Sequence, residues 1–161
     1  MNYLILMGSN EGDRTSYLRE AIRLMNLDIG EVLRESAYYE TAAWGHTDQP
    51  DFLNKAVELH SDMTPPEVMQ ALLRIEQEMG RIRTGKWAQR TIDLDMIYAG
   101  DEVISLPDLT VPHPEMQRRR FVLVPVCDLW PEELHPVLKL RNRELLARCE
   151  DPLEVRPYVA G

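Results

Sequence analysis

Cysteine is scarce in this sequence. Its 161 residues include only Cys127 and Cys149, which are too few for a disulfide framework and lack partners at zinc-site spacing. Long apolar runs are also missing, which argues against a membrane span. A short apolar run follows Met1 directly, without the basic leader or cleavage site of a secretory signal. We therefore expect a cytoplasmic protein with no membrane association.

Positive charge is in short supply as well. The chain has 18 Lys and Arg residues against 27 Asp and Glu, a formal net charge of −9, which argues against nonspecific binding to nucleic acid. Seven of those 18 nevertheless lie between Arg81 and Arg120. A basic patch on an acidic protein indicates a small anionic ligand. The length fits a single domain over residues 1–161.

Hydrophobic periodicity predicts a series of strands and helices. Apolar spacing indicates one helix over residues 15–25, and a capping box of Thr64 and Glu67 starts a second helix that ends near Gly80. Extended segments are predicted at residues 3–7, 31–39, 52–59 and 91–99. The segments 31–39 and 52–59 are expected to pair, with a long loop of residues 41–50 between them.

The resulting order is strand, helix, strand, strand, helix, strand. This split βαββαβ pattern predicts an α+β sandwich with helices on one face of an antiparallel sheet. Beyond residue 100 we expect a hairpin or loop near residues 102–110 and a compact element over residues 119–129. That element is either a helix or a strand, and the rest forms a short C-terminal extension.

Asp93 and Asp95 are the central chemical feature. Side chains at i and i+2 of a strand project from one face, roughly 7 Å apart. Two carboxylates so placed can bind one or two Mg²⁺ ions that keep positions open for water and phosphates. An edge strand with a solvated acidic face is an equally good explanation of an isolated pair.

Arginines near this pair favour a metal–phosphate site. Arg81, Arg83 and Arg90 lie just upstream, and guanidinium groups make bidentate contacts with phosphate. Surface ion pairs, each worth less than about 1 kcal/mol, are the alternative. Trp87 in the same loop either covers a bound ring or anchors the loop, and His113 either contacts a phosphate or is simply exposed.

The segment of residues 80–86 approaches the phosphate-binding P-loop pattern, but we reject that interpretation. Trp87 stands where the Mg²⁺-binding Ser or Thr should be. The segment also follows a predicted helix and leads into a strand, which is the reverse of a P-loop. A basic loop that contains an aromatic residue is therefore expected.

Four segments together resemble the 6-hydroxymethyl-7,8-dihydropterin pyrophosphokinase family. They are Gly8-Ser9-Asn10, residues 48–54, residues 90–95 with the motif Arg-Thr-Ile-Asp-Leu-Asp, and residues 109–113. The resemblance covers nearly the whole chain. It implies a ferredoxin-like fold and the transfer of a pyrophosphoryl group from ATP to hydroxymethyl dihydropterin in folate biosynthesis, with AMP as the second product.

The resemblance also implies roles for individual residues. Asp93 and Asp95 would hold two Mg²⁺ ions, while Arg81 and Arg90 would grip the triphosphate as catalytic residues. The implied ATP contacts are Glu76, Arg83, Trp87, Met96, Thr110, His113 and Arg119. The implied pterin contacts are Thr41, Ala42, Trp44, Phe52, Asn54 and Phe121.

Phe52 and Phe121 are the only two phenylalanines of the chain. The resemblance assigns both to the pterin, and an aromatic slot suits a flat heterocycle whose edge contacts polar groups. Core packing would account for either phenylalanine alone. The coincidence of both favours a binding slot.

Two other function classes share this topology. A metal-dependent nucleotidyl transferase would also use paired aspartates, but it would release pyrophosphate rather than AMP. An RNA-binding module would use exposed aromatics, which the acidic charge disfavours. We expect a monomer whose partners are its two small-molecule substrates.

Overall fold

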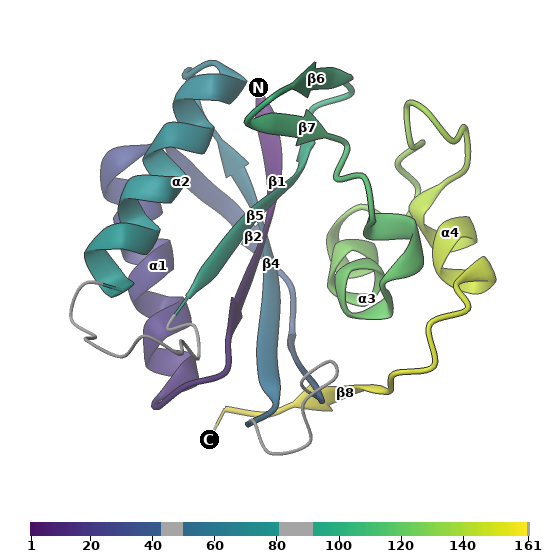
Figure 1. Ribbon diagram of the computed structural model, residues 1–161, viewed down its shortest axis with the longest axis horizontal. Coiled ribbons are helices and arrows are strands. Elements are labelled where there is room, and N and C mark those ends of the chain that lie inside the picture. The colour runs from purple at the N-terminus through teal and green to yellow at the C-terminus, as the bar shows by residue number, and fades with distance from the viewer. Residues whose placement is uncertain (43–49, 81–91, 161) are drawn as a thin grey trace.

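The computed structural model describes residues 1–42, 50–80 and 92–160. Figure 1 shows the strands and helices of these ranges. The strands are β1 (Asn2–Ser9), β2 (Glu31–Glu35), β3 (Tyr38–Thr41), β4 (Phe52–His60), β5 (Asp93–Ala99), β6 (Ile104–Leu106), β7 (Leu109–Val111) and β8 (Val155–Tyr158). The helices are α1 (Arg14–Asp28), α2 (Pro65–Gly80), the 3₁₀ turn η1 (Met116–Arg118), α3 (Arg120–Leu129) and α4 (Asn142–Arg148).

A six-stranded antiparallel sheet forms the centre of the molecule. Its strands run in the order β5-β1-β4-β3-β8, and β2 also pairs with β4. The predicted strands at residues 3–7, 52–59 and 91–99 correspond to β1, β4 and β5. The α+β class and the antiparallel sheet are therefore confirmed.

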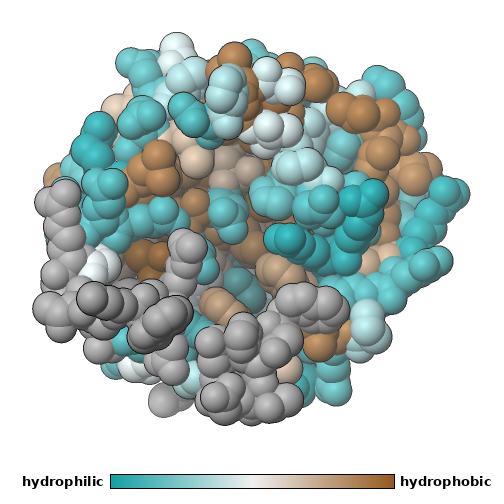
Figure 2. All heavy atoms as spheres, viewed as in Figure 1, coloured by the Kyte–Doolittle hydropathy of each residue, from teal (hydrophilic) through white to brown (hydrophobic). Residues whose placement is uncertain are grey.

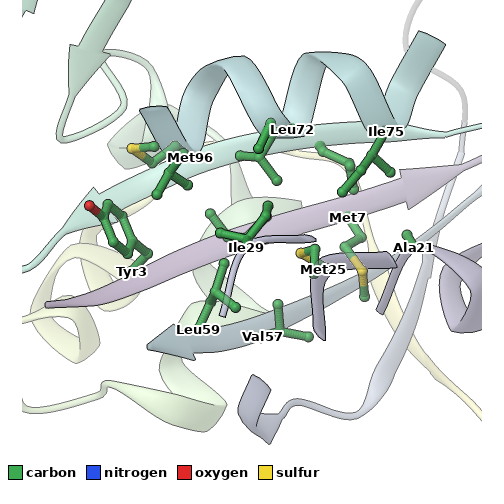
Figure 3. Close-up of a cluster of buried hydrophobic side chains, with 14 of the residues drawn as sticks. Tyr3, Met7, Ala21, Met25, Ile29, Val57, Leu59, Leu72, Ile75 and Met96 are labelled. Carbon is green, nitrogen blue, oxygen red and sulfur yellow. The ribbon is translucent and has the colours of Figure 1, made fainter. Parts of the chain in front are cut away.

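Helices α1 and α2 cover one face of the sheet (Figure 1). The predicted stripe of α2 is buried there, from Val68 to Met79, and its capping box is present. Thr64 N–H donates to the Glu67 carboxylate at 2.8 Å. Figure 3 shows Met25 and Ile75 of the two helical segments lying against Met7 and Val57 of the strands. This packing makes the first hydrophobic core.

The opposite face of the sheet carries a second core. Leu4, Leu6 and Ala56 point to this side and pack against Val122 and Val126 of α3. The element predicted at residues 119–129 is thus a helix, and the predicted hairpin near residues 102–110 is β6–β7. Helix α4 packs on α3, as Figure 1 shows. The expectation of helices on one face of the sheet is therefore corrected, because α3 packs on the other face.

The segment expected to be extended over residues 31–39 is interrupted at Ser36 and Ala37, which separate β2 from β3. Ser36 N–H donates to Ala56 O at 2.8 Å, and Ser36 Oγ accepts from Ala56 N–H at 2.9 Å. The hydroxyl thus replaces a carbonyl of the ladder, as serine side chains do at strand breaks. Ala37 N–H is then free to donate to Asp128 of α3.

None of the described helices is long and apolar enough to span a membrane. Figure 2 shows a surface on which hydrophilic residues predominate, with hydrophobic residues gathered over β6, β7 and the chain that leads into α4. Val103, Leu106 and Val137 are among the exposed apolar side chains.

Candidate active site

Asp93 and Asp95 lie on the sheet face that carries α3. In the ladder between β1 and β5, Asp93 is opposite Gly8 and Asp95 is opposite Leu6. Leu94 between them is buried in the core on the other face. Both carboxylates border the same cavity. The structure therefore places the two aspartates on one face of the sheet, as predicted.

The cavity between the sheet and α3, which we call the sheet cavity, has a volume of about 190 Å³. Its lining residues are Leu6, Gly8, Thr41, Ala42, Phe52, Asn54, Asp93, Asp95, Arg119, Phe121 and Leu153. The predicted pterin contacts Phe52 and Phe121 come from β4 and α3, far apart in the sequence. Their side chains supply apolar walls, while the aspartates lie at one side. A flat ring with a polar edge suits such a space.

Buried polar atoms also belong to this wall. Asn54 Nδ2 donates to Met7 O at 3.2 Å, whereas Asn54 Oδ1 and Thr41 Oγ1 are buried without a hydrogen-bond partner in the described part of the chain. Buried polar atoms are normally paired, because an unpaired one loses its contacts with water. Two such atoms in the wall of one cavity indicate a site for a ligand with hydrogen-bonding groups.

Gly8 keeps the floor of the sheet cavity open. A Cβ at this position would lie 2.6 Å from Asn54 Nδ2, well inside contact distance. Strand β1 can therefore pass close to Asn54 only because residue 8 has no side chain. This close approach explains why a glycine begins the Gly8-Ser9-Asn10 motif.

Helix α3 is fixed over the sheet by hydrogen bonds from several elements. Tyr39 Oη donates to Asp128 at 2.8 Å, and Trp130 Nε1 donates to Glu58 of β4 at 3.0 Å. At its N-terminus, the backbone N–H of Arg120 donates to the Asp151 carboxylate at 3.0 Å. These bonds place Phe121 and Arg119 at the rim of the sheet cavity.

A second cavity lies between β5, the β6–β7 hairpin and α2, and we call it the hairpin cavity. Its volume is about 280 Å³. Its lining residues are Met69, Asp95, Met96, Pro107, Asp108, Leu109, Thr110, His113 and Pro114. The predicted ATP contacts Met96, Thr110 and His113 thus lie together. Asp95 borders both cavities.

His113 is a neutral hydrogen-bonding group in this structure. Burial lowers its pKa most, and the nearby Arg119 guanidinium lowers the pKa further, against a smaller opposing effect of Glu115. Its Nδ1 accepts from Glu115 N–H at 3.2 Å, so the proton of the neutral ring sits on Nε2. Nε2–H is then available as a donor to an oxygen.

Two predicted ATP contacts are placed differently from the rest. Glu76 of α2 accepts a 2.7 Å hydrogen bond from the backbone N–H of Leu94, the residue between the two aspartates. Arg119 borders the sheet cavity. Glu76 therefore fixes the strand that carries the aspartates. The Arg119 guanidinium is also close enough to His113 of the hairpin cavity to lower the pKa of that histidine.

Several predicted site residues lie outside the described ranges: Trp44, Arg81, Arg83, Trp87 and Arg90. Their roles stay predictions. Conversely, Leu6 and Leu153 border the sheet cavity without having been predicted. Leu6 follows from strand alternation with Gly8, so the sequence contained that signal. Leu153 had no such signal, because its place depends on how the C-terminal segment returns to the sheet.

Comparisons with known proteins agree with this geometry. Residues 4–131 match the family model described as 7,8-dihydro-6-hydroxymethylpterin-pyrophosphokinase (HPPK). The chain is 45% identical over 131 residues to a 2-amino-4-hydroxy-6-hydroxymethyldihydropteridine pyrophosphokinase of Synechocystis sp., covering 81% of this chain and 67% of that one. It is 42% identical over 126 residues to the protein of the same name from Bacillus subtilis, covering 78% and 75%.

Longer proteins contain a similar part. A mitochondrial folate synthesis bifunctional protein of Pisum sativum is 41% identical over 126 residues, which cover 78% of this chain and 24% of that protein. A crystal structure of Plasmodium falciparum HPPK-DHPS has a TM-score of 0.75 at 15% identity and covers 91% of this chain. The chain spans 45% of that structure, so this likeness concerns the fold of one part.

Proposed function

The chain belongs to the HPPK family, and we propose that its Asp93 and Asp95 bind Mg²⁺ between an ATP site in the hairpin cavity and a pterin site in the sheet cavity. The activity of the family is the transfer of the pyrophosphoryl group of ATP to hydroxymethyldihydropterin in folate biosynthesis. The observation that carries the proposal is that Asp95 borders both cavities.

The donor set agrees with magnesium. In the described ranges no three His, Cys, Asp or Glu side chains are grouped as a metal site. Mg²⁺ commonly takes one or two carboxylates and completes its shell with water and substrate phosphates, so a pair of aspartates is sufficient. When bound, the metal supplies positive charge to the triphosphate and makes a nearby alcohol easier to deprotonate.

The chemical step follows from this arrangement. The hydroxymethyl oxygen attacks the β-phosphorus of ATP, and the bond from that phosphorus to the oxygen shared with the α-phosphorus breaks. AMP leaves with the bonding electrons, and the hydroxyl proton passes to solvent. The chain's contribution is placement: the sheet cavity directs the acceptor toward Asp95, and the hairpin cavity directs the donor there.

Individual residues have distinct tasks in this proposal. Phe52 and Phe121 hold the pterin ring between them, and Asn54 and Thr41 bond its polar edge. His113 donates Nε2–H to a phosphate oxygen. Arg81 and Arg90, which the family resemblance assigns to the triphosphate, neutralise charge on the transferred group. We propose a monomer as the active unit.

The aspartate pair provides the decisive test. We expect Asp95→Ala to lower turnover by roughly a hundredfold or more, because removing the ligand weakens metal binding and leaves the triphosphate charge uncompensated. Turnover is measured as AMP released from ATP, Mg²⁺ and hydroxymethyl dihydropterin. Asp101→Ala, a change at an exposed carboxylate just after β5, serves as the matched control and should keep normal turnover.

Two outcomes would contradict the proposal. An Asp95→Ala protein with normal, Mg²⁺-dependent turnover would remove the metal role. Release of pyrophosphate with a nucleotidylated acceptor, instead of AMP with a diphosphorylated one, would assign the chain to nucleotidyl transfer. The thermal unfolding of the variant, followed by circular dichroism, separates loss of chemistry from loss of fold.

A further inference from the structure

Strand β8 lies beyond residue 131, where the match to the family model ends, yet it belongs to the central sheet. We infer that the C-terminal segment of residues 151–158 completes the pterin site of this protein, with Arg156 as the positioning residue. Arg156 holds together the ends of β3 and β4, from which Thr41 and Phe52 enter the sheet cavity. This inference rests on the proposed function and deepens it.

The strand register brings β8 to the edge of the site. Thr41 is opposite Phe52 on one side and opposite Val155 on the other. One residue earlier in β3, Glu40 is opposite Arg156. Thr41 and Phe52 are the last residue of β3 and the first of β4, so no further ladder pair in the described ranges supports them beyond this point. Strand β8 supports this end of the sheet from the outer edge of β3.

Arg156 lies on the sheet face opposite the cavity. Side chains alternate along a strand, so Glu40 points away from the side that Thr41 faces. Arg156 Nη2 donates to Glu40 Oε1 at 3.2 Å and to Asp51 Oδ2 at 2.9 Å. Glu40 immediately precedes Thr41, and Asp51 immediately precedes Phe52. One guanidinium therefore joins the two backbone positions that adjoin the cavity residues.

Helix α1 strengthens the same network. Arg14 forms a 2.7 Å ion pair with Glu40 and donates to the backbone carbonyl of Asp51 at 2.9 Å. Its guanidinium also lies 5.2 Å from the ring centre of Tyr158 in β8. Burial by itself raises the pKa of Glu40, but the bonds from Arg14 and Arg156 outweigh it and hold that pKa below its usual value. Glu40 is therefore an ionised centre of the network at neutral pH.

The same C-terminal segment contributes a wall residue. Leu153 borders the sheet cavity beside Phe121. It is held there because Arg120 of α3 donates from its side chain to the carbonyls of Cys149 and Asp151, at 2.8 and 3.1 Å. Leu153 N–H donates to the Asp151 carboxylate at 3.0 Å. The segment thus touches the cavity through Leu153 and stabilises its opposite rim through Arg156.

The expected consequence concerns acceptor binding rather than chemistry. The side chains of Arg156 and Asp51 are 41% and 39% exposed, so loss of their pair should cost the fold little. A small shift of Thr41 and Phe52, however, changes the contacts that a bound ring makes. The ATP site in the hairpin cavity contains no residue of this network. A loss of pterin binding without a loss of ATP binding would therefore identify a positioning role for Arg156.

The experiment compares Arg156→Ala with Arg143→Ala in the full chain. Arg143 of α4 also loses a carboxylate partner, Glu132, at an exposed place that borders neither cavity. For Arg156→Ala we expect KM for hydroxymethyl dihydropterin to rise roughly three- to tenfold, with KM for ATP and kcat within about twofold of wild type. Arg143→Ala should leave all three unchanged. Arg156→Lys, which keeps the charge without the planar guanidinium, should restore part of the binding.

A fluorescence titration of the pterin against each protein, with Mg²⁺ and a nonhydrolysable ATP analogue, gives a dissociation constant without turnover. The same selective loss in Arg156→Ala is expected there. Equal pterin binding by the two Ala variants, or parallel increases in KM for both substrates, would refute the positioning role. A wild-type protein that binds pterin but releases no AMP would refute the proposed function. The titration would still show whether Arg156 contributes to pterin binding.

Discussion

Gly8 illustrates how one residue without a side chain shapes the sheet cavity. A Cβ at residue 8 would lie 2.6 Å from Asn54 Nδ2, which donates a hydrogen bond to Met7 O. The floor of the sheet cavity therefore depends on the absence of a side chain at residue 8. The same amide leaves Oδ1 as an acceptor in the cavity wall.

Replacing Gly8 by alanine tests this interpretation. The added methyl group must displace Asn54, so we expect the dissociation constant for hydroxymethyl pterin to rise by roughly tenfold or more. Equilibrium fluorescence titration measures it. Gly80→Ala is the control, because a Cβ there meets no atom within 4 Å among the described residues. Unchanged pterin binding by Gly8→Ala would show that Asn54 does not contribute to the site.

Helix α2 links stability to the active site at the scale of a secondary-structure element. Its first turn is closed by the capping box of Thr64 and Glu67, and its last turns bring Glu76 to the backbone of Leu94. The cap and the site contact lie at opposite ends of one helix. Weakening the cap should therefore affect folding and leave the chemistry intact.

We expect Thr64→Ala to lower the free energy of unfolding by about 1 kcal/mol, because the N–H group of Glu67 loses its side-chain acceptor. Urea unfolding followed by circular dichroism measures this change. Thr64→Ser keeps the hydroxyl and should match wild type. A Thr64→Ala protein as stable as wild type would show that the cap does not stabilise α2. Impaired AMP release at full stability would show that the cap affects the chemistry instead.

The whole molecule is a sheet with helical layers on both faces, and the C-terminal layer contains a buried histidine. His135 is 4% exposed, its Nδ1 accepts from the backbone N–H groups of Val137 and Leu138, and its ring meets Tyr98 edge-on. Burial lowers the pKa of His135 in the folded protein. The neutral ring is thus part of the native packing.

Stability should consequently fall in mild acid. Between pH 7 and 5 the unfolded chain, whose histidine has a pKa of about 6.5, binds more protons than the folded one, so the free energy of unfolding decreases as pH falls. Urea unfolding at several pH values measures the slope. His135→Asn, which retains an acceptor but does not titrate, should reduce the slope and leave the part due to His113, whose pKa burial also lowers. A variant slope as steep as that of wild type would exclude His135 as the responsible group.

Short-range patterns accounted for much of this protein. The α2 stripe, its capping box and the β5 alternation depend on residues within a few positions of one another, so the sequence alone identified them. The motif containing Asp93 and Asp95 likewise indicated a phosphate and metal chemistry, and its family resemblance agrees with the comparisons. The single-domain assignment over residues 1–161 and the cytoplasmic location stay predictions.

Other features depended on contacts between distant segments. The break at Ser36 depends on its pairing with Ala56, and the second helical layer depends on how α3 packs over Leu4 and Leu6. The spacing of residues along the chain does not predict such contacts between distant segments. Local patterns therefore identified β1, β4, β5, α1 and α2, the aspartate pair and the reaction class. That Asp95 borders two cavities, and that β8 pairs with the strand carrying Thr41, became clear from the folded structure alone, because strand register sets which distant side chains meet.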